Sequence, residues 1–557
     1  MKIHDKGNYA RKNGRRFVRK TVRYIQKQKN KEGLMMKMKK IMSLGMAAVT
    51  ALTIVAGAAG CGSSDSGGNA TGGNSQDSTA AVENNQDNGE METIVFATPL
   101  TKTVDMTPIE DALNEITEKK INVHVKIEGI SMANYSNQIG LMMSGGEQLD
   151  VMGWIGTYSV LVSKNQLMEI EDLLDQYGTE TKEVLGDEFL KSTTSGGHVY
   201  GLPTNNGKGA VMSLVIRDDL IEELDLPVDQ LTQASDFEGY CKNLDIITEM
   251  FAKIHKAHPE MACVVPNQTN PNSLVFTLIP FMDGLNDNYG VLMPGEDSTI
   301  ENMYATDEFE KLCEYAYEWN QAGYVLEDAT TTQEASNTYM QNNRTAGFFV
   351  IGEEGQAEQI TTATGVDVEA IKLLTPYITT TNMNGLGFGI SATSKHPEAA
   401  MKFLNEMYTN PEVVNLLDWG IEGEHYVVQD DGTVDFPEGV DANTTTYGLN
   451  MDWYFGNQFL GKIWGKGRDT TIYERLEYNN KNAAFTPVMG FSYDSTPVST
   501  ELAALQNVVN QYLPGLYCGS LNPSETIPEF LKALDDAGLN VVIEEKQNQL
   551  DAWKAAN

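Results

Sequence analysis

Residues 93–97 read TIVFA, an apolar run that is bounded by polar residues and Pro99. Four segments follow it in order: TPIEDALNEITEK (107–119), INVHVKI (121–127), NYSNQIGLMMS (134–144) and DVMGWI (150–155). The apolar runs predict strands, and the 3.6-residue spacing of apolar side chains predicts helices between them. The order strand–helix–strand–helix–strand is typical of an α/β fold in which helices cover a largely parallel sheet. Ligands of such folds gather beyond the carboxyl ends of the strands.

The charge composition of the chain limits the kinds of molecule that it can bind. The chain has 557 residues, with 40 Lys+Arg against 77 Asp+Glu and a formal net charge of −37. Residues 1–60 hold 15 of the basic and 2 of the acidic side chains, so the remainder carries 25 basic and 75 acidic ones. Because nucleic-acid binding requires a basic surface, this composition argues against a nucleic-acid partner.

The N-terminal region predicts export and lipid anchoring. Residues 41–60 form an uncharged run that follows Lys37, Lys39 and Lys40 and ends at Cys61. A basic segment, an apolar segment and small residues before a cleavage point are typical of a signal peptide, which we assign to residues 35–60. The alternative is a retained membrane helix. Ala58-Ala59-Gly60-Cys61 resembles the bacterial lipobox, which implies a lipid on the Cys61 thiol and attachment to the membrane.

The residues on either side of this signal have separate interpretations. Residues 1–34 are basic and lack apolar periodicity, and we interpret them as an upstream extension, with translation starting at Met35, Met36 or Met38. The alternative is a basic arm that binds nucleic acid or anionic lipid. Residues 61–91 are rich in Gly, Ser, Asn and Asp, which predicts a flexible tether that reaches roughly 30 Å.

Four further stretches carry a family resemblance. They are NYSNQIGLMMSGGEQLDVM (134–152), GHVYGLPTNN with VIRDDL (197–206 and 215–220), NGLGFGISATSKHPEAAMKFLNEMYTNPEVVNLLDWGIEGEHY (384–426), and GFSYDSTPVSTELAALQNVVNQYLPGL with PEFLKALDDAGLNVVIEEKQNQLDAW (490–516 and 528–553). Together they resemble the extracellular solute-binding lipoproteins of bacterial ABC sugar importers, the maltose-binding-protein-like family 1. The last two resemble its oligosaccharide or aldouronate subgroup, including the characteristic C-terminal domain.

The resemblance implies a two-lobed α/β fold of the periplasmic-binding-protein type, with a hinge between the lobes. One lobe would comprise residues 92–202 plus 390–427, and the other residues 203–389 plus 428–557. The chain would cross between them near Pro203, Gly389 and Tyr426. We expect Gly385, Gly387 and Gly389 to relax the backbone at a crossing. The implied role is capture of an oligosaccharide and its delivery to permease subunits. We expect a monomer without a cofactor or a bound metal, since the spacing of Asp430, Asp431 and Asp435 differs from that of a calcium loop, the alternative for this turn.

Residue types suggest where a sugar would bind. Sugars offer apolar C–H faces for aromatic rings and hydroxyls for amides and carboxylates. The resemblance places Trp154 at a ligand-stacking position and marks 271–284 as a ligand-lining segment. The candidate ligand-binding residues are the aromatic and polar side chains in the expected inter-lobe loops: Trp154, Tyr158, Asn205, Asn206, Asn272, Phe281, Asp283, Trp453, Tyr454, Asn457 and Trp464. For each Trp, the alternative is packing in the core.

Two other functions remain open. A receptor for peptides or other small solutes would share the fold, and a surface glycoside hydrolase would need two carboxylates at a suitable separation. The sequence contains no GxSxG or HExxH signature, so we expect no enzymatic activity. The cysteines at 241, 263, 313 and 518 form no CxxC pair, which favours buried thiols over a disulfide framework or zinc site.

Overall fold

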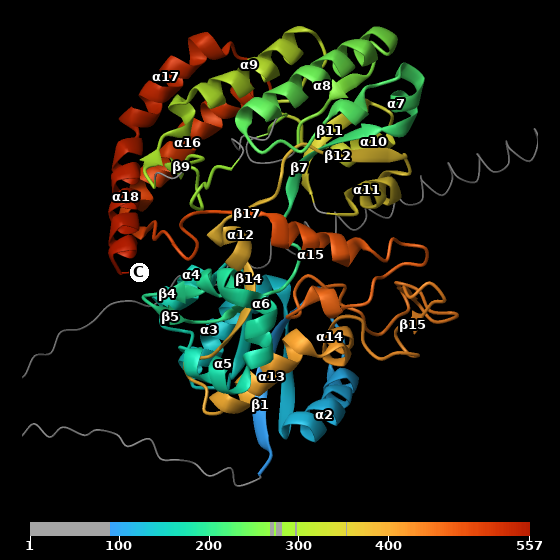
Figure 1. Cartoon of the computed structure of the whole chain (residues 1–557), viewed down its shortest axis with the longest axis vertical. Coiled ribbons are helices and arrows are strands. Elements are labelled where there is room, and N and C mark those ends of the chain that lie inside the picture. The colour runs from blue at the N-terminus through green and yellow to red at the C-terminus, as the bar shows by residue number, and fades with distance from the viewer. Residues whose placement is uncertain (1–89, 268–271, 275–280, 296–297, 353, 557) are drawn as a thin grey trace, which may run out of the picture. The chain divides into compact units, whose positions relative to one another are not determined.

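The computed structural model describes residues 90–267, 272–274, 281–295, 298–352 and 354–556 (Figure 1). The predicted upstream extension at 1–34, the signal peptide at 35–60 and Cys61 lie outside the described residues. So does nearly all of the predicted tether at 61–91. The described chain builds two separate sheets of five and four strands, each of which is the centre of one lobe.

The first lobe contains the stretch with which the sequence analysis began. Its sheet has the order β2-β1-β3-β14-β6, with β1 parallel to β2 and β3, and β14 antiparallel to β3 and β6. The alternation predicted from the apolar spacing is confirmed. The elements are β1 (Glu92–Leu100), α2 (Thr107–Ile121), β2 (Val123–Ser131), α3 (Tyr135–Gly145), β3 (Val151–Ile155), β6 (Leu202–Pro203) and β14 (Leu386–Ile390).

Further short helices and a hairpin complete this lobe. Helix α13 packs against α5, α6 and β1, and its apolar face contributes Ala400, Phe403 and Leu404 to the core. The elements are α4 (Tyr158–Ser163), α5 (Glu171–Tyr177), α6 (Thr179–Lys191), β4 (Thr194–Ser195), β5 (His198–Val199), α13 (Pro397–Thr409), α14 (Pro411–Asp418), β15 (Val427–Val428) and β16 (Val434–Asp435).

The second lobe has a mixed sheet with the order β12-β7-β11-β8. Strand β7 reads VMSLVIR and is buried along its whole length, because helices and strands cover both of its faces. The elements are β7 (Val211–Arg217), α7 (Asp218–Leu224), α8 (Phe237–Ala257), β8 (Ala262–Val264), β9 (Val291–Leu292), β10 (Ile300–Glu301), α9 (Asp307–Gln321), α10 (Ser336–Gln341), β11 (Thr345–Gly352), α11 (Gln356–Thr364) and β12 (Val368–Lys372).

Three C-terminal helices extend the core of the second lobe. They are α16 (Ser499–Tyr517), α17 (Pro523–Asp536) and α18 (Leu539–Ala556), coloured orange-red to red beside α9 in Figure 1. The ring of Phe530 lies 5.1 Å from that of Tyr304, centroid to centroid. Leu505, Val542 and Leu550 are fully buried in the same cluster as Trp319. The C-terminal segment is therefore part of the second-lobe core.

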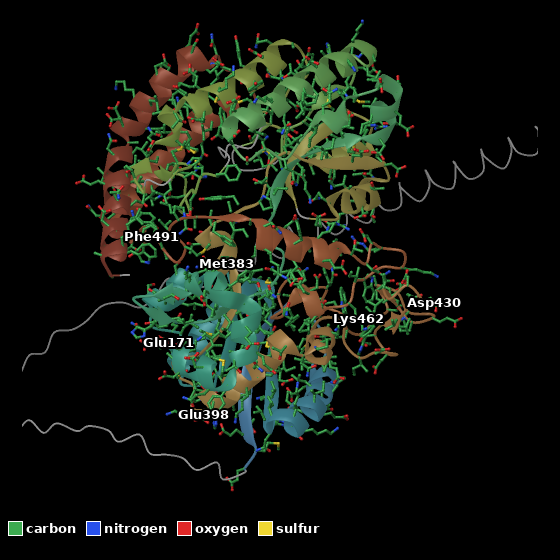
Figure 2. All side chains as sticks on the ribbon, viewed as in Figure 1. Glu171, Met383, Glu398, Asp430, Lys462 and Phe491 are labelled. Atoms are coloured by element: carbon green, nitrogen blue, oxygen red, sulfur yellow. The ribbon has the colours of Figure 1, made fainter. Side chains whose placement is uncertain are left out.

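The segments that connect the lobes contain α12 (Thr380–Asn384), α15 (Ile472–Asn482) and a short parallel pair of β13 (Tyr377–Ile378) and β17 (Ala484–Phe485). Met383 of α12 packs with Ile378 and Met489, and Figure 2 labels it at this junction. Strand β14 already belongs to the first-lobe sheet, so this crossing lies before Gly389, the expected point.

The course of residues 428–557 differs from the expected division. Tyr447, Met451, Tyr454 and Phe455 lie in the first-lobe core, and the Tyr454 ring is 4.8 Å from Phe388. The chain therefore stays with the first lobe beyond Tyr426. The physical reason is the apolar face of this segment, which is buried against β14 and α13 and which the resemblance alone did not place.

Candidate functional site

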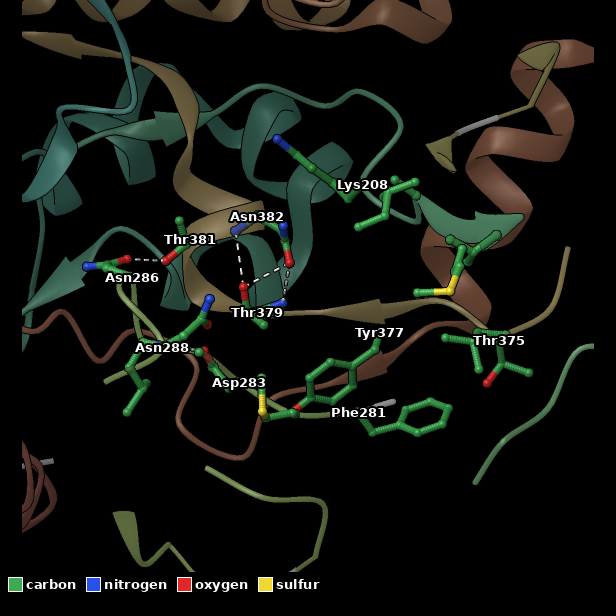
Figure 3. A pocket seen from close by; sticks show the side chains of 18 residues that line it. Lys208, Phe281, Asp283, Asn286, Asn288, Thr375, Tyr377, Thr379, Thr381 and Asn382 are labelled. Atoms are coloured by element: carbon green, nitrogen blue, oxygen red, sulfur yellow. Dashed lines mark hydrogen bonds between the residues drawn. The ribbon is translucent and has the colours of Figure 1, made fainter. Parts of the chain in front are cut away.

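A pocket of about 320 Å³ opens where the connecting segments leave the second-lobe sheet (Figure 3). Strand β7, the β13–α12 segment and the loop before β9 supply most of its wall. Its lining residues are Lys208, Ala210, Val211, Met212, Phe281, Met282, Asp283, Gly284, Leu285, Asn286, Asn288, Ile351, Leu374, Thr375, Tyr377, Thr379, Thr381 and Asn382. An apolar floor with polar groups at its edge is the usual composition of a small-molecule site.

Two half-buried aromatic rings contribute to the apolar part of the pocket. The rings of Phe281 and Tyr377 meet edge to face, with centroids 5.7 Å apart and planes at 80°. Figure 3 shows both side chains beside the cavity. Burial raises the pKa of the Tyr377 hydroxyl to about 12, so this group keeps its proton and can donate a hydrogen bond at neutral pH. The pair can offer both a stacking face and a polar tip.

The polar part of the pocket combines a carboxylate with hydroxyls and amides. Asp283 is 3% exposed, and burial raises its pKa. Its Oδ1 accepts a hydrogen bond of 3.0 Å from the Leu285 amide, while its Oδ2 has no hydrogen-bond partner among the described residues. The Thr381 hydroxyl donates to Asn286 Oδ1 over 2.6 Å, which links α12 to the opposite wall. A buried acceptor without a partner is a favourable point for a ligand hydroxyl.

The wall that carries Asp283 has an unusual backbone. We call residues 281–292 the binding loop. Phe281, Leu285, Asn286 and Asn288 all have positive φ values, of 63°, 46°, 80° and 61°. Such values cost free energy for residues with a side chain and persist only where the surroundings hold them. Gly284 also has a reason to be glycine, since a Cβ there would lie 1.9 Å from Asn288 Oδ1.

Three of the predicted ligand amides instead brace the first crossing. Asn205 Nδ2 donates to Asn457 Oδ1 over 3.1 Å, and Asn457 Nδ2 donates to the Tyr408 carbonyl. Asn206 Nδ2 donates to the Trp453 carbonyl over 3.0 Å. All three asparagines are less than a tenth exposed. Their hydrogen bonds hold the crossing segment beside the chain around residue 457, which a sequence pattern cannot reveal.

Trp154 packs in the first-lobe core in this structure. It is 1% exposed, and its indole Nε1 donates to the Asn384 carbonyl over 2.7 Å. A Cβ at Gly387 would lie 2.3 Å from the indole, and one at Gly201 would lie 2.5 Å from it. The expected role of the 385–389 glycines thus needs correction, because none of them has positive φ and Gly387 makes room for this ring.

The remaining candidates lie outside the lining of the pocket. Tyr158 donates to the Thr193 carbonyl over 2.6 Å, and Asn272 donates to the carbonyls of Ala329 and Thr332. Tyr454 is fully buried, with half-buried Trp453 beside it. Trp464 packs on Trp419, centroids 4.8 Å apart. Of the eleven candidates, the pocket collects Phe281 and Asp283.

Most of the polar residues that line the pocket were not among the predicted site residues. Asn286 and Asn288 lie in DGLNDNYG, and Thr379, Thr381 and Asn382 lie in TTTNMN. The first run is rich in Asp, Asn and Gly, which favour turns and tolerate positive φ, and the second is rich in Thr and Asn, whose side chains hydrogen-bond to nearby backbone groups. Polar runs of this kind, close to a point where the chain was expected to cross between the lobes, could have indicated these lining residues. Tyr377, two residues before the second run, gave no such signal.

Membrane-spanning helices and metal-ligand clusters are both absent from the described residues. No helix within the described ranges is long and apolar enough to cross a membrane. No three His, Cys, Asp or Glu side chains in those ranges gather as metal ligands would. Cys263, Cys313 and Cys518 are buried free thiols, and burial raises the pKa of Cys263 and Cys518 to about 12.

Comparison with known proteins agrees with this architecture. A carbohydrate ABC transporter substrate-binding protein of Streptococcus pneumoniae serotype 4 is 22% identical over 461 residues, covering 79% of this chain and 86% of its own. The crystal structure of the N-glycan transport solute binding protein of Streptococcus pneumoniae matches with a TM-score of 0.66 at 20% identity, covering 83% of this chain and 99% of that one. An HMO-binding solute binding protein of Bifidobacterium longum infantis matches with a TM-score of 0.53 at 15% identity, covering 83% and 99%.

Two family models match separate parts of the chain. Residues 487–555 match a domain of unknown function, DUF3502, which contains α16, α17 and almost all of α18. Residues 102–414 match the family described as bacterial extracellular solute-binding protein. These 313 residues are more than half of the chain and include the second-lobe sheet and every strand of the first-lobe sheet except β1. The protein is therefore a member of the bacterial extracellular solute-binding protein family, with the two-lobed α/β fold of that family.

Proposed function

We propose that this protein captures an extracellular oligosaccharide and delivers it to the permease of an ABC importer. Members of its family are non-catalytic components of transporters. The observation that carries the proposal is the pocket in which the Phe281 and Tyr377 rings meet the Asp283 carboxylate at the junction of the lobes. The names of similar proteins, which refer to carbohydrate, N-glycan and HMO, point to the same class of ligand.

The pocket suits the surface chemistry of a sugar. A half-buried ring can cover the C–H face of a pyranose, and such contacts contribute about 0.5–1.5 kcal/mol beyond area burial. Around the rings, Asn286, Asn288 and Asn382 offer amides that both donate and accept, as vicinal hydroxyls require. No proton transfer or bond cleavage is needed for this role.

Transport requires that ligand binding change the conformation of the receptor. A ligand that contacts both lobes only when they are closed shifts the population toward that state by its difference in affinity. In our proposal, the sugar binds first to the second-lobe pocket, and residues of the first lobe complete the site on closure. Ligand contact by the predicted first-lobe residues Trp154 and Tyr158 stays a prediction for the closed state.

We further propose that the mature protein is held at the outer face of the cell membrane by a lipid on Cys61. Support comes from the lipobox-like sequence, the preceding apolar run and the polar residues that follow. A Cys61→Ala variant is expected to appear in the medium instead of the membrane fraction. Metabolic labelling with a palmitate analogue checks the same point, and a variant that remains in the membrane fraction would contradict the anchor.

Calorimetry with a panel of intact oligosaccharides, peptides and polyamines tests the binding function. We expect stoichiometric binding of at least one oligosaccharide that is recovered intact by chromatography. A Tyr377→Ala variant should bind it about tenfold more weakly, since the loss of a stacking ring is on the order of 1.4 kcal/mol. A Phe436→Ala variant, which removes a half-buried ring packed on Trp464 outside the pocket lining, is the matched control. Binding of peptides alone or cleavage of the sugar would overturn the proposal.

A further inference from the structure

The backbone of the binding loop needs support from outside itself. Four of its residues with side chains have positive φ, and Gly290 adds a value of 95°. Some support comes from inside the loop: Asp283 and Leu292 exchange two backbone bonds of 2.9 Å, the Asp287 and Asn288 amides donate to the Gly284 carbonyl, and the carboxylates of Asp283 and Asp287 accept from the Leu285 and Tyr289 amides. A strained segment keeps one conformation only where its surroundings over-determine it.

A buried lysine of the C-terminal helix α18 supplies such support. The Lys546 side chain is 0% exposed, and its ammonium donates to Asp287 Oδ1 and, over 2.9 Å, to the Gly290 carbonyl. The ammonium also lies 4.8 Å from the centre of the Tyr493 ring. Burying a lysine is costly unless its charge is paired and its donors are used. The buried ammonium therefore favours the loop conformation in which Asp287 and the Gly290 carbonyl accept its hydrogen bonds.

Other side chains of the C-terminal segment reinforce the same attachment. Gln547 accepts over 2.8 Å from the amide of Ile300, which belongs to β10, the strand that pairs with the end of the loop. The Ile543 side chain approaches Gly290 so closely that a Cβ there would lie 3.0 Å from its Cγ1. Helix α18 therefore contacts the loop through a charge pair, a close backbone approach and an amide on the neighbouring strand.

The opposite side of the loop faces the pocket. Asp283, Asn286 and Asn288 line the cavity, while Asp287 turns toward Lys546 (Figure 3 labels the first three). Lys546 itself is absent from the lining of the pocket. The loop is thus held between α18 behind it and α12 across the cavity, where Thr381 bonds to Asn286.

We propose that the C-terminal segment 487–555 is the scaffold of the binding loop, and that Lys546 is a positioning residue for ligand affinity. The inference gives a role to a segment whose matching family is described as of unknown function. It rests on the proposed function only in taking the pocket as the sugar site. Preorganised contacts raise affinity because the cost of ordering the loop is met before the ligand arrives.

Two variants and one control test the proposal in the full-length protein. Lys546→Met removes the ammonium and leaves Asp287 buried without its partner, so both stability and affinity should fall. The double variant Asp287→Asn with Lys546→Met removes both charges, which should return most of the stability. The control is Leu550→Ala, which opens a cavity one turn further along α18. The Leu550 side chain is 0% exposed and is absent from the pocket lining.

Amide hydrogen exchange of residues 283–292 in the ligand-free protein is the first readout. We expect exchange at least about tenfold faster in Lys546→Met and in the double variant, but not in Leu550→Ala. Calorimetry with the sugar identified for the wild type is the second readout, with affinity about tenfold weaker in the same two variants. If the double variant regains stability but still binds the sugar more weakly, Lys546 positions the loop for the ligand and does more than stabilise the fold.

The outcomes separate this inference from the proposed function. If the wild type binds no sugar, the proposed function fails, and the exchange measurement still decides the role of Lys546. If the wild type binds a sugar while Lys546→Met keeps both its affinity and the slow exchange of the loop, the scaffold role is overturned. Recovery of both stability and affinity by the double variant would also overturn it.

Discussion

The Trp154 region of the first lobe and the Tyr377 region of the second lobe both place an aromatic residue beside a connection between the lobes. Their environments differ. Trp154 is 1% exposed in a slot that Gly201 and Gly387 leave open for it, whereas Tyr377 is half-buried and lines a cavity. An aromatic residue near the end of a strand can therefore pack in the core as readily as it can line a ligand pocket. The neighbours across the sheet decide between the two.

The largest expected effect concerns the Trp154 slot itself. Trp154→Ala should lower the free energy of unfolding by about 3–5 kcal/mol, because it leaves a cavity in a packed core and the Asn384 carbonyl without its donor. Urea denaturation measures this change. The same substitution at the ring that lines the pocket, Tyr377→Ala, should cost much less stability. Near-wild-type stability of Trp154→Ala together with lost sugar binding would reverse our comparison.

A second test fills the slot instead of emptying it. In Gly387→Ala the new methyl group would meet the indole of Trp154 and the Leu202 carbonyl at 2.3 and 2.5 Å. Overpacking of this kind typically costs about 1–3 kcal/mol, to be measured by thermal unfolding. Gly140→Ala is the control, since a Cβ at that helical position meets nothing within 4 Å. Equal stability of the two variants would mean that the slot is not tightly packed.

Two buried carboxylates extend the comparison to polar groups. Asp418 in the first lobe and Asp283 at the pocket each keep an Oδ2 without a hydrogen-bond partner among the described residues. Burial raises the pKa of Asp418 well above the ordinary value, and Asp452 raises it further. Asp418→Asn keeps the acceptor for the Met451 amide and removes a buried group that must either stay protonated or carry an unpaired charge. It should therefore raise the free energy of unfolding at neutral pH by about 1 kcal/mol, without loss of affinity.

The pH dependence of Asp418→Asn has a defined sign. Because the folded-state pKa of Asp418 lies above 3.8, the native state keeps a proton that the unfolded state has already lost. The stability of the wild type should fall as the pH rises from about 4 toward the folded-state pKa, and the asparagine variant lacks this loss. Thermal unfolding of both proteins across this pH range checks the divergence. Parallel curves would show that Asp418 titrates normally.

The smallest expected effect is on ligand affinity at the other carboxylate. Asp283→Asn should weaken sugar binding about threefold to tenfold, since a charged acceptor bonds a hydroxyl more strongly than an amide does. The Leu285 amide keeps an acceptor in this variant, so the loop should stay in place. Calorimetry against Asp418→Asn measures the difference. Equal affinities of the two variants would remove Asp283 from the ligand contacts.

Much of the fold was accessible from local patterns, but the site was not. Apolar alternation placed β1, α2, β2, α3 and β3 within a few residues, because burial of one face imposes a period on the sequence. The candidate residues were chosen by chemical type, and in this structure most of them make hydrogen bonds within the protein or pack in its core. Asn205 and Asn457, 252 positions apart, satisfy each other across a crossing. No local pattern reports such a pairing.

The sequence by itself determined the α/β class, the acidic surface that disfavours nucleic acid, and the resemblance to a family of solute receptors. Each of these depends on composition or on residues close together in the chain. The tertiary structure decided which rings face a cavity and which fill a core. Trp154 is buried by Gly201, Asn384 and Gly387, whereas Tyr377 is half-buried beside the cavity, in contact with Phe281 of the binding loop. The burial of a side chain is set by its neighbours in space, and some of these neighbours lie more than two hundred residues away in the chain.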